Sequence, residues 1–311
     1  MSRNAKHFSI VGVLILVLTA AVYWAISGYF FELPTAAATQ ALLIDEMFTG
    51  HYILIAFLFS IVVVPMGYSI IVFRQQEGDD TDAPHIHENT ALEIAWTVIP
   101  ILIVIGFGVW GVVSYNQVRA ATPGEVVIHS QAEKWDWTFY YPAENHISSR
   151  SLVLEVNVPV HLELQSRDII HSFWVPKFRV KQDAFPYDTE NPAVNFASGP
   201  DYDPEPHHYV SQELRFTPVT EGVYRVRCAE ICGTDHYAML ANVFVLSSAN
   251  YQAWLAGDFA LPPDPSKQNM ETNPEEFVVS YLDELEHFDI NTGYTPPPDP
   301  LAVPAAAEEE G

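Results

Sequence analysis

Three long apolar stretches in the first 115 residues constrain the fold of this chain more than any other feature. They are Phe8–Phe31, Tyr52–Phe73 and Ile94–Tyr115. A helix needs about 20 residues to cross a hydrocarbon layer, and each stretch is long enough. The sequence therefore predicts a protein anchored in a membrane by N-terminal helices.

The first stretch has two interpretations. It follows Arg3 and Lys6, so it is either a retained helix or an export signal cut near the small residues 36–38. Its apolar run exceeds the usual signal core of about 7–15 residues, which favours retention.

Basic residues near the spans indicate the orientation, because Lys and Arg remain on the cytoplasmic side. Arg3 and Lys6 precede the first stretch, and Arg74 directly follows the second. Three crossings of the cell membrane then put everything after Tyr115 on the outer side. Only these three residues carry the signal, so the opposite orientation stays open.

Short alternating runs begin near residue 120, punctuated by Pro and Gly. These runs are Glu125–Ser130, Leu152–Asn157, His161–Leu164, Val223–Arg227 and Ala241–Leu246. They predict an all-β part, an antiparallel sandwich or barrel. The Pro-, Asp- and Asn-rich segment 186–206 is predicted to be a long loop inserted in it.

The C-terminal tail, residues 249–311, has thirteen acidic residues against the single Lys267. Its end is rich in Pro, Ala and Glu, so most of it is expected to be extended or mobile. One segment, 274–288, has apolar residues at helical spacing. It is either a surface helix on this chain's own domain or a docking helix for a neighbouring subunit.

These boundaries predict four parts: a first span or signal in 1–40, a membrane hairpin in 41–117, the β domain in 118–248, and the tail. The whole chain has 39 acidic and 14 basic side chains, a formal net charge of −25. That balance argues against nucleic-acid binding through a basic face and favours a basic partner. A solvated acidic surface explains the same balance.

The stretch 228–239 carries the chemistry. Cys228, Cys232, His236 and Met239 lie within twelve residues, and these soft sulfur and imidazole ligands select copper. A blue-copper site has one thiolate, whereas two bridging thiolates suit two coppers. A disulfide is one alternative, but it does not explain why Gly, His and Met follow the cysteines at fixed offsets. A zinc site is a second alternative, but methionine is a poor zinc ligand.

A second histidine ligand must come from elsewhere, and His171 is the best candidate. It follows a strand-like run and is expected in a polar and aromatic loop that closes the site from a neighbouring turn. The remaining histidines are weaker candidates, because they lie on the membrane or cytoplasmic side, in the long loop, or without ligand-like surroundings. They include His7, His85, His87, His129, His146, His161, His207, His208 and His287.

The chain resembles subunit II of the haem–copper cytochrome c oxidases. Residues 228–239 fit the family motif C-x-E-x-C-G-x-x-H-x-x-M at every specified position. Further stretches agree in the family's order: Glu93–Pro100, Trp135–Trp137, the His171 loop and Lys181–Ala184. The resemblance covers about residues 45–247. It implies two membrane helices, here with one extra N-terminal span, followed by an all-β cupredoxin sandwich.

The resemblance also implies roles for individual residues. The side chains of His171, Cys228, Cys232, His236 and Met239 would ligate a dinuclear copper centre, CuA. Glu230 would ligate it through its backbone carbonyl, and the Glu230 carboxylate would reach a magnesium ion at the interface with subunit I.

Two more residues have roles in the family. Trp135 resembles the aromatic residue at which electrons arrive from cytochrome c, although a rim or core aromatic is the alternative. Glu93 resembles the carboxylate at the cytoplasmic mouth of a proton-uptake path. An ionisable group at the end of a span is costly unless it faces water or protein, and Glu93 equally suits a helix end.

The function implied is that of a subunit of a proton-translocating cytochrome c oxidase. Electrons from cytochrome c or a small blue-copper protein would pass through CuA to haem in subunit I, where O2 is reduced, and subunit III would be a further partner. No Cys-x-x-Cys-His occurs, so the donor would be a separate protein. The alternative is a membrane-anchored copper carrier or assembly protein of cupredoxin fold.

Overall fold

The computed structural model describes residues 3–75, 77–78, 88–144, 147–186, 212–262 and 288–294. The chain forms two compact units, one of Met1–Ala36 and Ala41–Ala120, the other of Ala37–Gln40 and Ala121–Gly311. Except for their end residues Pro186 and Phe288, the predicted insertion 186–206 and the predicted helix 274–288 lie outside the described residues. Phe288 lies in a strand rather than in a helix.

The first unit is helical, and its three helices cover the three predicted spans. They are α1 (Arg3–Ala25, continued by a π-helical turn, Ile26–Phe30), α2 (Thr39–Val72) and α3 (Thr90–Arg119). Each is long and apolar enough to cross a membrane. Large apolar side chains such as Phe8, Leu16 and Val104 lie exposed along them. Such a surface requires lipid or another protein as cover, so the helices are membrane-spanning segments.

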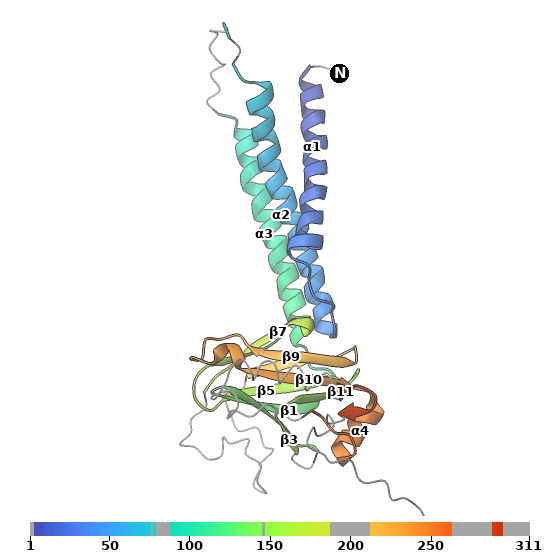
Figure 1. Cartoon of the computed structure of the whole chain (residues 1–311). Coiled ribbons are helices and arrows are strands. Elements are labelled where there is room, and N and C mark those ends of the chain that lie inside the picture. The colour runs from blue at the N-terminus through green and yellow to red at the C-terminus, as the bar shows by residue number, and fades with distance from the viewer. Residues whose placement is uncertain are drawn as a thin grey trace, which may run out of the picture. The chain divides into compact units, whose positions relative to one another are not determined.

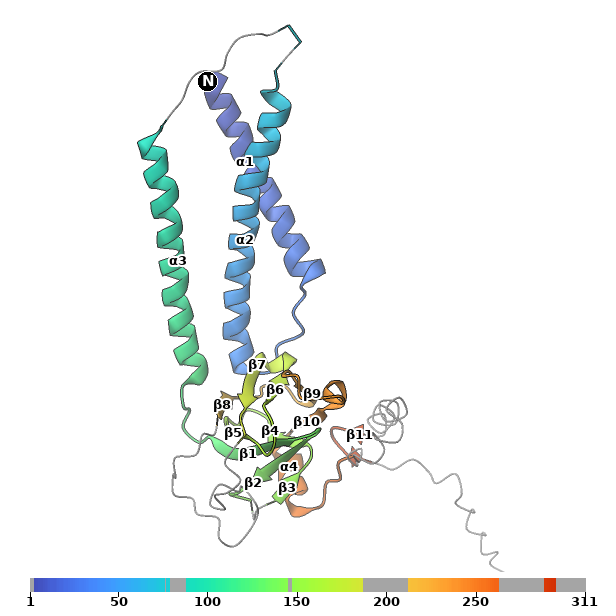
Figure 2. The same cartoon turned by 90° about the vertical axis from the view of Figure 1, so that its left-hand side faces the viewer.

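A few specific contacts join the helices. His7 Nδ1 of α1 lies 2.8 Å from the Tyr68 hydroxyl of α2, and Figure 2 shows α1 crossing α2. Between α2 and α3, a Cβ at Gly50 would come within 2.5 Å of the Trp110 ring, so only glycine permits this approach.

The start of α3 is fixed by reciprocal capping. The Asn89 side chain accepts a hydrogen bond from Leu92 N at 3.1 Å, and Asn89 N donates to Glu93 Oε1 at 3.2 Å. Together they satisfy two of the amides that a helix N-terminus leaves unpaired. Glu93 therefore has a structural partner at the helix end.

The second unit is a sandwich of two five-stranded sheets (Figure 1). One sheet has the order β3-β2-β1-β5-β8 and the other β4-β10-β9-β6-β7. The strands are β1 (Val126–Glu133), β2 (Asp136–Tyr141), β3 (Ile147–Ser149), β4 (Leu152–Glu155), β5 (Val160–Ser166), β6 (His171–Val175), β7 (Val180–Ala184), β8 (Gln212–Phe216), β9 (Gly222–Cys228) and β10 (Leu240–Leu246). The expected architecture, apolar N-terminal helices followed by an all-β sandwich, is confirmed.

The prediction of a purely antiparallel sandwich is wrong in two places. β1 pairs with β5 in parallel, and β10 pairs with β4 in parallel. The chain leaves each sheet for the other between these partners, and such crossovers allow two strands of one sheet to run in the same direction.

The core lies between the sheets, where apolar side chains alternate inward. In β2 every second residue is buried, which places Trp137, Phe139 and Tyr141 inside. Trp137 meets the Phe173 ring of β6 edge to face at 5.7 Å. The buried Tyr141 hydroxyl is satisfied, because it donates to Val153 O and accepts from Val153 N.

The first residues of the tail form a short helix that the sequence analysis did not predict. α4 (Ser248–Ala256) begins at Ser247, whose side chain accepts from Asn250 N, and ends at Gly257 in a left-handed conformation. A hairpin of β11 (Phe288–Asp289) and β12 (Gly293–Tyr294) places Phe288 4.8 Å from the Phe244 ring.

The link between α1 and α2 is part of the sandwich unit. Ala37 N donates to Lys177 O, and Ala37 O accepts from Val219 N, both at 2.9 Å. Ala38 forms a bridge with Pro218 and is fully buried. We call Ala37–Gln40 the linker bridge; it joins the loop after β8 although it is far from that loop in sequence.

Candidate metal centre

Two neighbouring strands and one loop supply the predicted ligands. His171 is the first residue of β6 and Cys228 is the last of β9. Phe173 of β6 pairs with Cys228, so the two strands run side by side. His171 was expected in a loop; its position on a strand gives it a more rigid support than a turn would.

The loop from Cys228 to Met239 is closed at both ends. Cys228 N donates to Met239 O at 3.1 Å, and Ala229 N donates to Ser172 O of β6 at 2.9 Å. Within the loop His236 begins a 3-10 turn, His236–Ala238. The short spacing of the motif therefore folds its ligands back onto one another.

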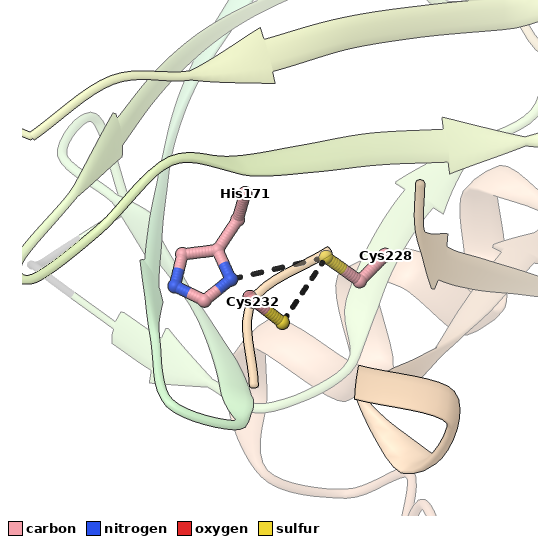
Figure 3. A group of neighbouring side chains, drawn as sticks. All are labelled: His171, Cys228 and Cys232. Atoms are coloured by element: carbon pink, nitrogen blue, oxygen red, sulfur yellow. Dashed lines mark hydrogen bonds between the residues drawn. The ribbon is translucent and has the colours of Figure 1, made fainter. Parts of the chain in front are cut away.

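The ligand side chains converge on the two sulfur atoms. Cys228 Sγ lies 3.8 Å from both His171 Nδ1 and Cys232 Sγ, as Figure 3 shows. Cys232 Sγ lies 3.4 Å from His236 Nδ1 and 3.8 Å from Met239 Sδ. The structure thus brings together all five side chains that were predicted as ligands.

Most of the cluster is buried, and both of its cysteines are free thiols. His171, Cys232 and Met239 have no exposed surface and Cys228 is 8% exposed, while His236 is half-buried. The two cysteines are not joined in a disulfide. Among the described residues, His171, Cys228 and Cys232 form a group whose ligand atoms all lie within 4.8 Å of one another.

The pKa values of Cys228 and Cys232 indicate that the pair of thiols would bind a cation. Burial raises the pKa of Cys228, but hydrogen bonds with His171 and with backbone groups lower it to about 6. For Cys232, burial and the charge on Cys228 raise the pKa to about 12. One thiolate is therefore stable near neutral pH, whereas two need a compensating positive charge.

The donor set fits soft metal ions. Two thiols, two imidazole nitrogens and a thioether match the preferences of copper rather than those of magnesium or calcium. The buried surroundings also match, because unpaired thiolates are costly there and metal-bound ones are not.

The second nitrogen of His171 has a partner that the sequence analysis did not assign. His171 Nε2 lies 2.8 Å from Asp168 Oδ1. Burial lowers the pKa of His171, but hydrogen bonds with Cys228 and Asp168 raise it overall. The Asp-x-x-His spacing was the available sequence signal, but that spacing alone does not show a contact.

Trp135 lies against the loop of the cluster. Its Nε1 donates to Cys232 O at 3.2 Å, and a Cβ at Gly233 would lie 3.0 Å from its ring. Gly233 has a φ of +121°, a conformation that favours glycine. The indole is half-buried, so it reaches both the cluster and the surface.

Glu230 has two different environments. The Cys228 thiol donates to its backbone carbonyl, with a sulfur–oxygen distance of 3.3 Å, while the residue as a whole is exposed. Its neighbour Ile231 is 84% exposed. The carbonyl thus faces the cluster, and the carboxylate is accessible from outside the chain.

Two other histidines of the sandwich, His129 and His161, do not belong to the cluster. His129 and His161 project from the sheet of β1 and β5, where they approach Glu163 and Glu213 at 3.6 and 3.7 Å. They therefore have acidic neighbours that the sequence analysis did not expect. His85, His87, His146, His207, His208 and His287 lie outside the described residues.

Comparisons with known proteins agree with the resemblance. The family model "Cytochrome C oxidase subunit II, transmembrane domain" matches residues 21–116. Cytochrome c oxidase subunit 2 of Synechocystis sp. is 26% identical over 305 residues, covering 81% of this chain and 85% of its own length. The same protein of Alkalihalophilus pseudofirmus is 29% identical over 222 residues, covering 69% and 58%.

Among solved structures, the chain is similar to the periplasmic domain of subunit II of cytochrome oxidase from Bradyrhizobium japonicum. It is 20% identical with a TM-score of 0.36 and covers 45% of this chain and 96% of that chain. The chain is thus similar to cytochrome c oxidase subunit II in two respects: its membrane helices match the family model, and relatives of that name align along most of its length.

Proposed function

We propose that this chain is the electron-accepting subunit of a proton-translocating cytochrome c oxidase. It would take electrons from a soluble donor at a dinuclear copper centre and deliver them to haem in subunit I. The observation that carries the proposal is the convergence of two buried thiols with two imidazoles and a thioether. A bound copper pair supplies reversible one-electron transfer.

The residues of the cluster would hold the metal and limit its movement. His171, Cys228, Cys232, His236 and Met239 are the side-chain ligands, with the Glu230 carbonyl as a further one. Strands β6 and β9 and the closed loop hold these ligands in place, which keeps structural change small when the charge changes. The burial of His171, Cys228, Cys232 and Met239 limits the access of water and so reduces solvent reorganisation.

Trp135 is proposed as the point at which electrons arrive. Its hydrogen bond to the carbonyl of Cys232 connects a partly exposed ring to a ligand through few bonds. The donor would be cytochrome c or a small blue-copper protein. The net charge of −25 supports a basic donor, because complementary charge speeds encounter.

The remaining assignments concern partners and place. We assign the exposed Glu230 carboxylate to a magnesium ion at the interface with subunit I, and we expect subunit III in the same complex. Glu93 is proposed at the mouth of a proton path. The helices would cross the cell membrane, with the sandwich on its outer side.

The copper content and spectrum of the full-length protein test this function. The protein is purified in detergent, loaded with copper and examined by metal analysis and electron paramagnetic resonance. We expect two coppers per chain and a seven-line pattern, because one electron shared by two copper nuclei splits in that way. Cys228→Ser should abolish this signal.

A matched pair of variants gives the control. Met239→Leu should change the hyperfine splitting, whereas Met47→Leu in α2 should leave it unchanged. One copper with a four-line pattern, or no copper in a folded protein, would contradict the proposal and favour a copper carrier or a structural role.

A further inference from the structure

Basic residues gather on the sheet that contains β6, β7 and β9, although the chain as a whole is acidic. The segments 176–184 and 222–228 hold five basic residues and a single acidic one, whereas the whole chain has 14 basic and 39 acidic residues. The five basic residues are Lys177, Arg179, Lys181, Arg225 and Arg227. This part of the surface therefore attracts negative charge, unlike the chain on average.

An exposed tryptophan lies between two of these cations. In the register of the strands, Trp174 of β6 pairs with Lys181 of β7 on one side and with Arg227 of β9 on the other. Paired residues of neighbouring strands point to the same face of a sheet. The alternate residues Phe173 and Val175 are buried in the core, so Trp174 points outward. Trp174, Lys181 and Arg227 thus form one row across the outer face, which we call the Trp174 row.

The Trp174 row is open to contact. Trp174 is 37% exposed, and Lys181 and Arg227 are exposed as well. Asp183, the one acidic residue of the two segments, is bonded to Lys181 Nζ at 2.9 Å and to Ser172 Oγ at 2.7 Å. The ion pairs within the described part of the chain do not include Arg227. The row thus presents an apolar ring beside a guanidinium group that lacks an acidic neighbour.

We propose that the Trp174 row is the surface with which the sandwich docks on an acidic patch of subunit I. Trp174 supplies the apolar contact, and Arg227 and Lys181 pair with carboxylates of the partner. The assignment of the partner rests on the proposed function, in which this chain is one subunit of an oxidase.

A protein partner suits the row better than lipid headgroups do. Trp and Arg are among the residues that most often contribute a large share of the binding energy at protein interfaces. The row also adjoins the loop of the metal cluster, because Ala229 N donates to Ser172 O in the strand of Trp174. Glu230, whose exposed carboxylate is proposed to face subunit I, is the next residue of this loop. Both features would then face one partner.

Site-specific cross-linking in the complete complex tests this contact. A photoreactive phenylalanine analogue replaces Trp174, the complex is purified from its own membrane and irradiated, and the cross-linked peptides are identified by mass spectrometry. We expect a cross-link to subunit I. The matched control is the same analogue in place of Ser148, an exposed residue of β3 in the other sheet, which should give no such cross-link.

Charge reversal tests the role of the cations. Arg227→Glu should lower the yield of the cross-link from position 174 about tenfold, because like charges would then meet at the contact. Lys267→Glu in the tail changes the net charge by the same amount and should leave the yield unchanged. The copper spectrum of each variant should match that of the wild type, because neither residue is a proposed ligand. Circular dichroism establishes that each variant is folded.

Two results would overturn the inference. Cross-links from position 174 to lipid alone, or to nothing, in a complex that retains copper and haem would assign the row to the membrane surface or to solvent. An undiminished yield in folded Arg227→Glu would show that charge does not hold the contact. If Arg227→Glu does not fold, Arg227→Gln takes its place and should lower the yield by a smaller factor. A wild-type complex without a copper pair would instead refute the proposed function.

Discussion

At the scale of single residues, His129 is a buried group that responds to acid. It lies in β1, opposite Glu163 of β5, and is 3% exposed. Burial, and to a lesser extent the neighbouring His161, lower its pKa to about 4. His129 is therefore neutral in the folded protein at pH values where the unfolded chain already binds a proton.

This difference predicts a loss of stability in mild acid. Below pH 6.5 the unfolded chain takes up a proton that folded His129 takes up only near pH 4. The folded state therefore loses about 3 kcal/mol as the pH falls through this window. Thermal unfolding of the full-length protein at pH 7, 5.5 and 4 should show a smaller decline in Tm for His129→Gln than for the wild type.

The control is Tyr140→Phe, which alters the neighbouring strand and should keep the wild-type decline of Tm with falling pH. The same decline in the wild type and in both variants would contradict the assignment to His129.

At the scale of elements, the linker bridge is sensitive to side-chain size. Ala38 is fully buried beside Pro218, whereas Ala121 at the other connection is exposed. Ala38→Leu forces extra methylenes into a packed site and should cost about 1–3 kcal/mol, while Ala121→Leu should cost little. Thermal unfolding of the two variants measures the difference, and equal Tm values would show that the bridge adds no stability.

The first turn of α3 lets the capping contact of Glu93 be separated from its proposed role in a proton path. A glutamine at this position keeps the oxygen that accepts from Asn89 N but lacks the charge. In the assembled oxidase, Glu93→Gln should slow proton-coupled turnover and leave the helix intact, whereas Glu93→Ala should affect both. Oxygen consumption measures turnover, and circular dichroism measures the helix content of each variant. Unchanged turnover in Glu93→Gln would show that Glu93 only caps the helix.

At the scale of the whole molecule, the net charge of −25 predicts how salt affects the proposed electron transfer from a soluble donor. Attraction between this surface and a basic cytochrome c is screened over about 8 Å at physiological ionic strength. Stopped-flow measurement of electron transfer from reduced cytochrome c should therefore give a second-order rate constant that falls steeply with added salt. A rate that is independent of salt would indicate an apolar docking surface or an uncharged donor.

The sequence predicted those parts of the molecule in which neighbouring residues act together. The membrane helices follow from local apolar length, and the loop Cys228–Met239 contains four of the five side chains proposed as ligands within one motif. His171 was chosen from its surroundings in the sequence, whereas the Asp168 contact, the parallel strand pairs and the linker bridge were missed. Each of these features is a contact between segments that the tertiary fold brings together. The local sequence of one segment does not show which other segment it will contact.

The linker bridge also affects the order in which the protein can be made. Ala37–Gln40 is synthesised long before Thr217–Val219, the residues to which it bonds. The sandwich unit therefore cannot complete its hydrogen bonding until β8 and the following loop have emerged from the ribosome. A gene fragment starting at Ala121 encodes a sandwich that lacks this segment, with Lys177 O and Val219 N deprived of their partners.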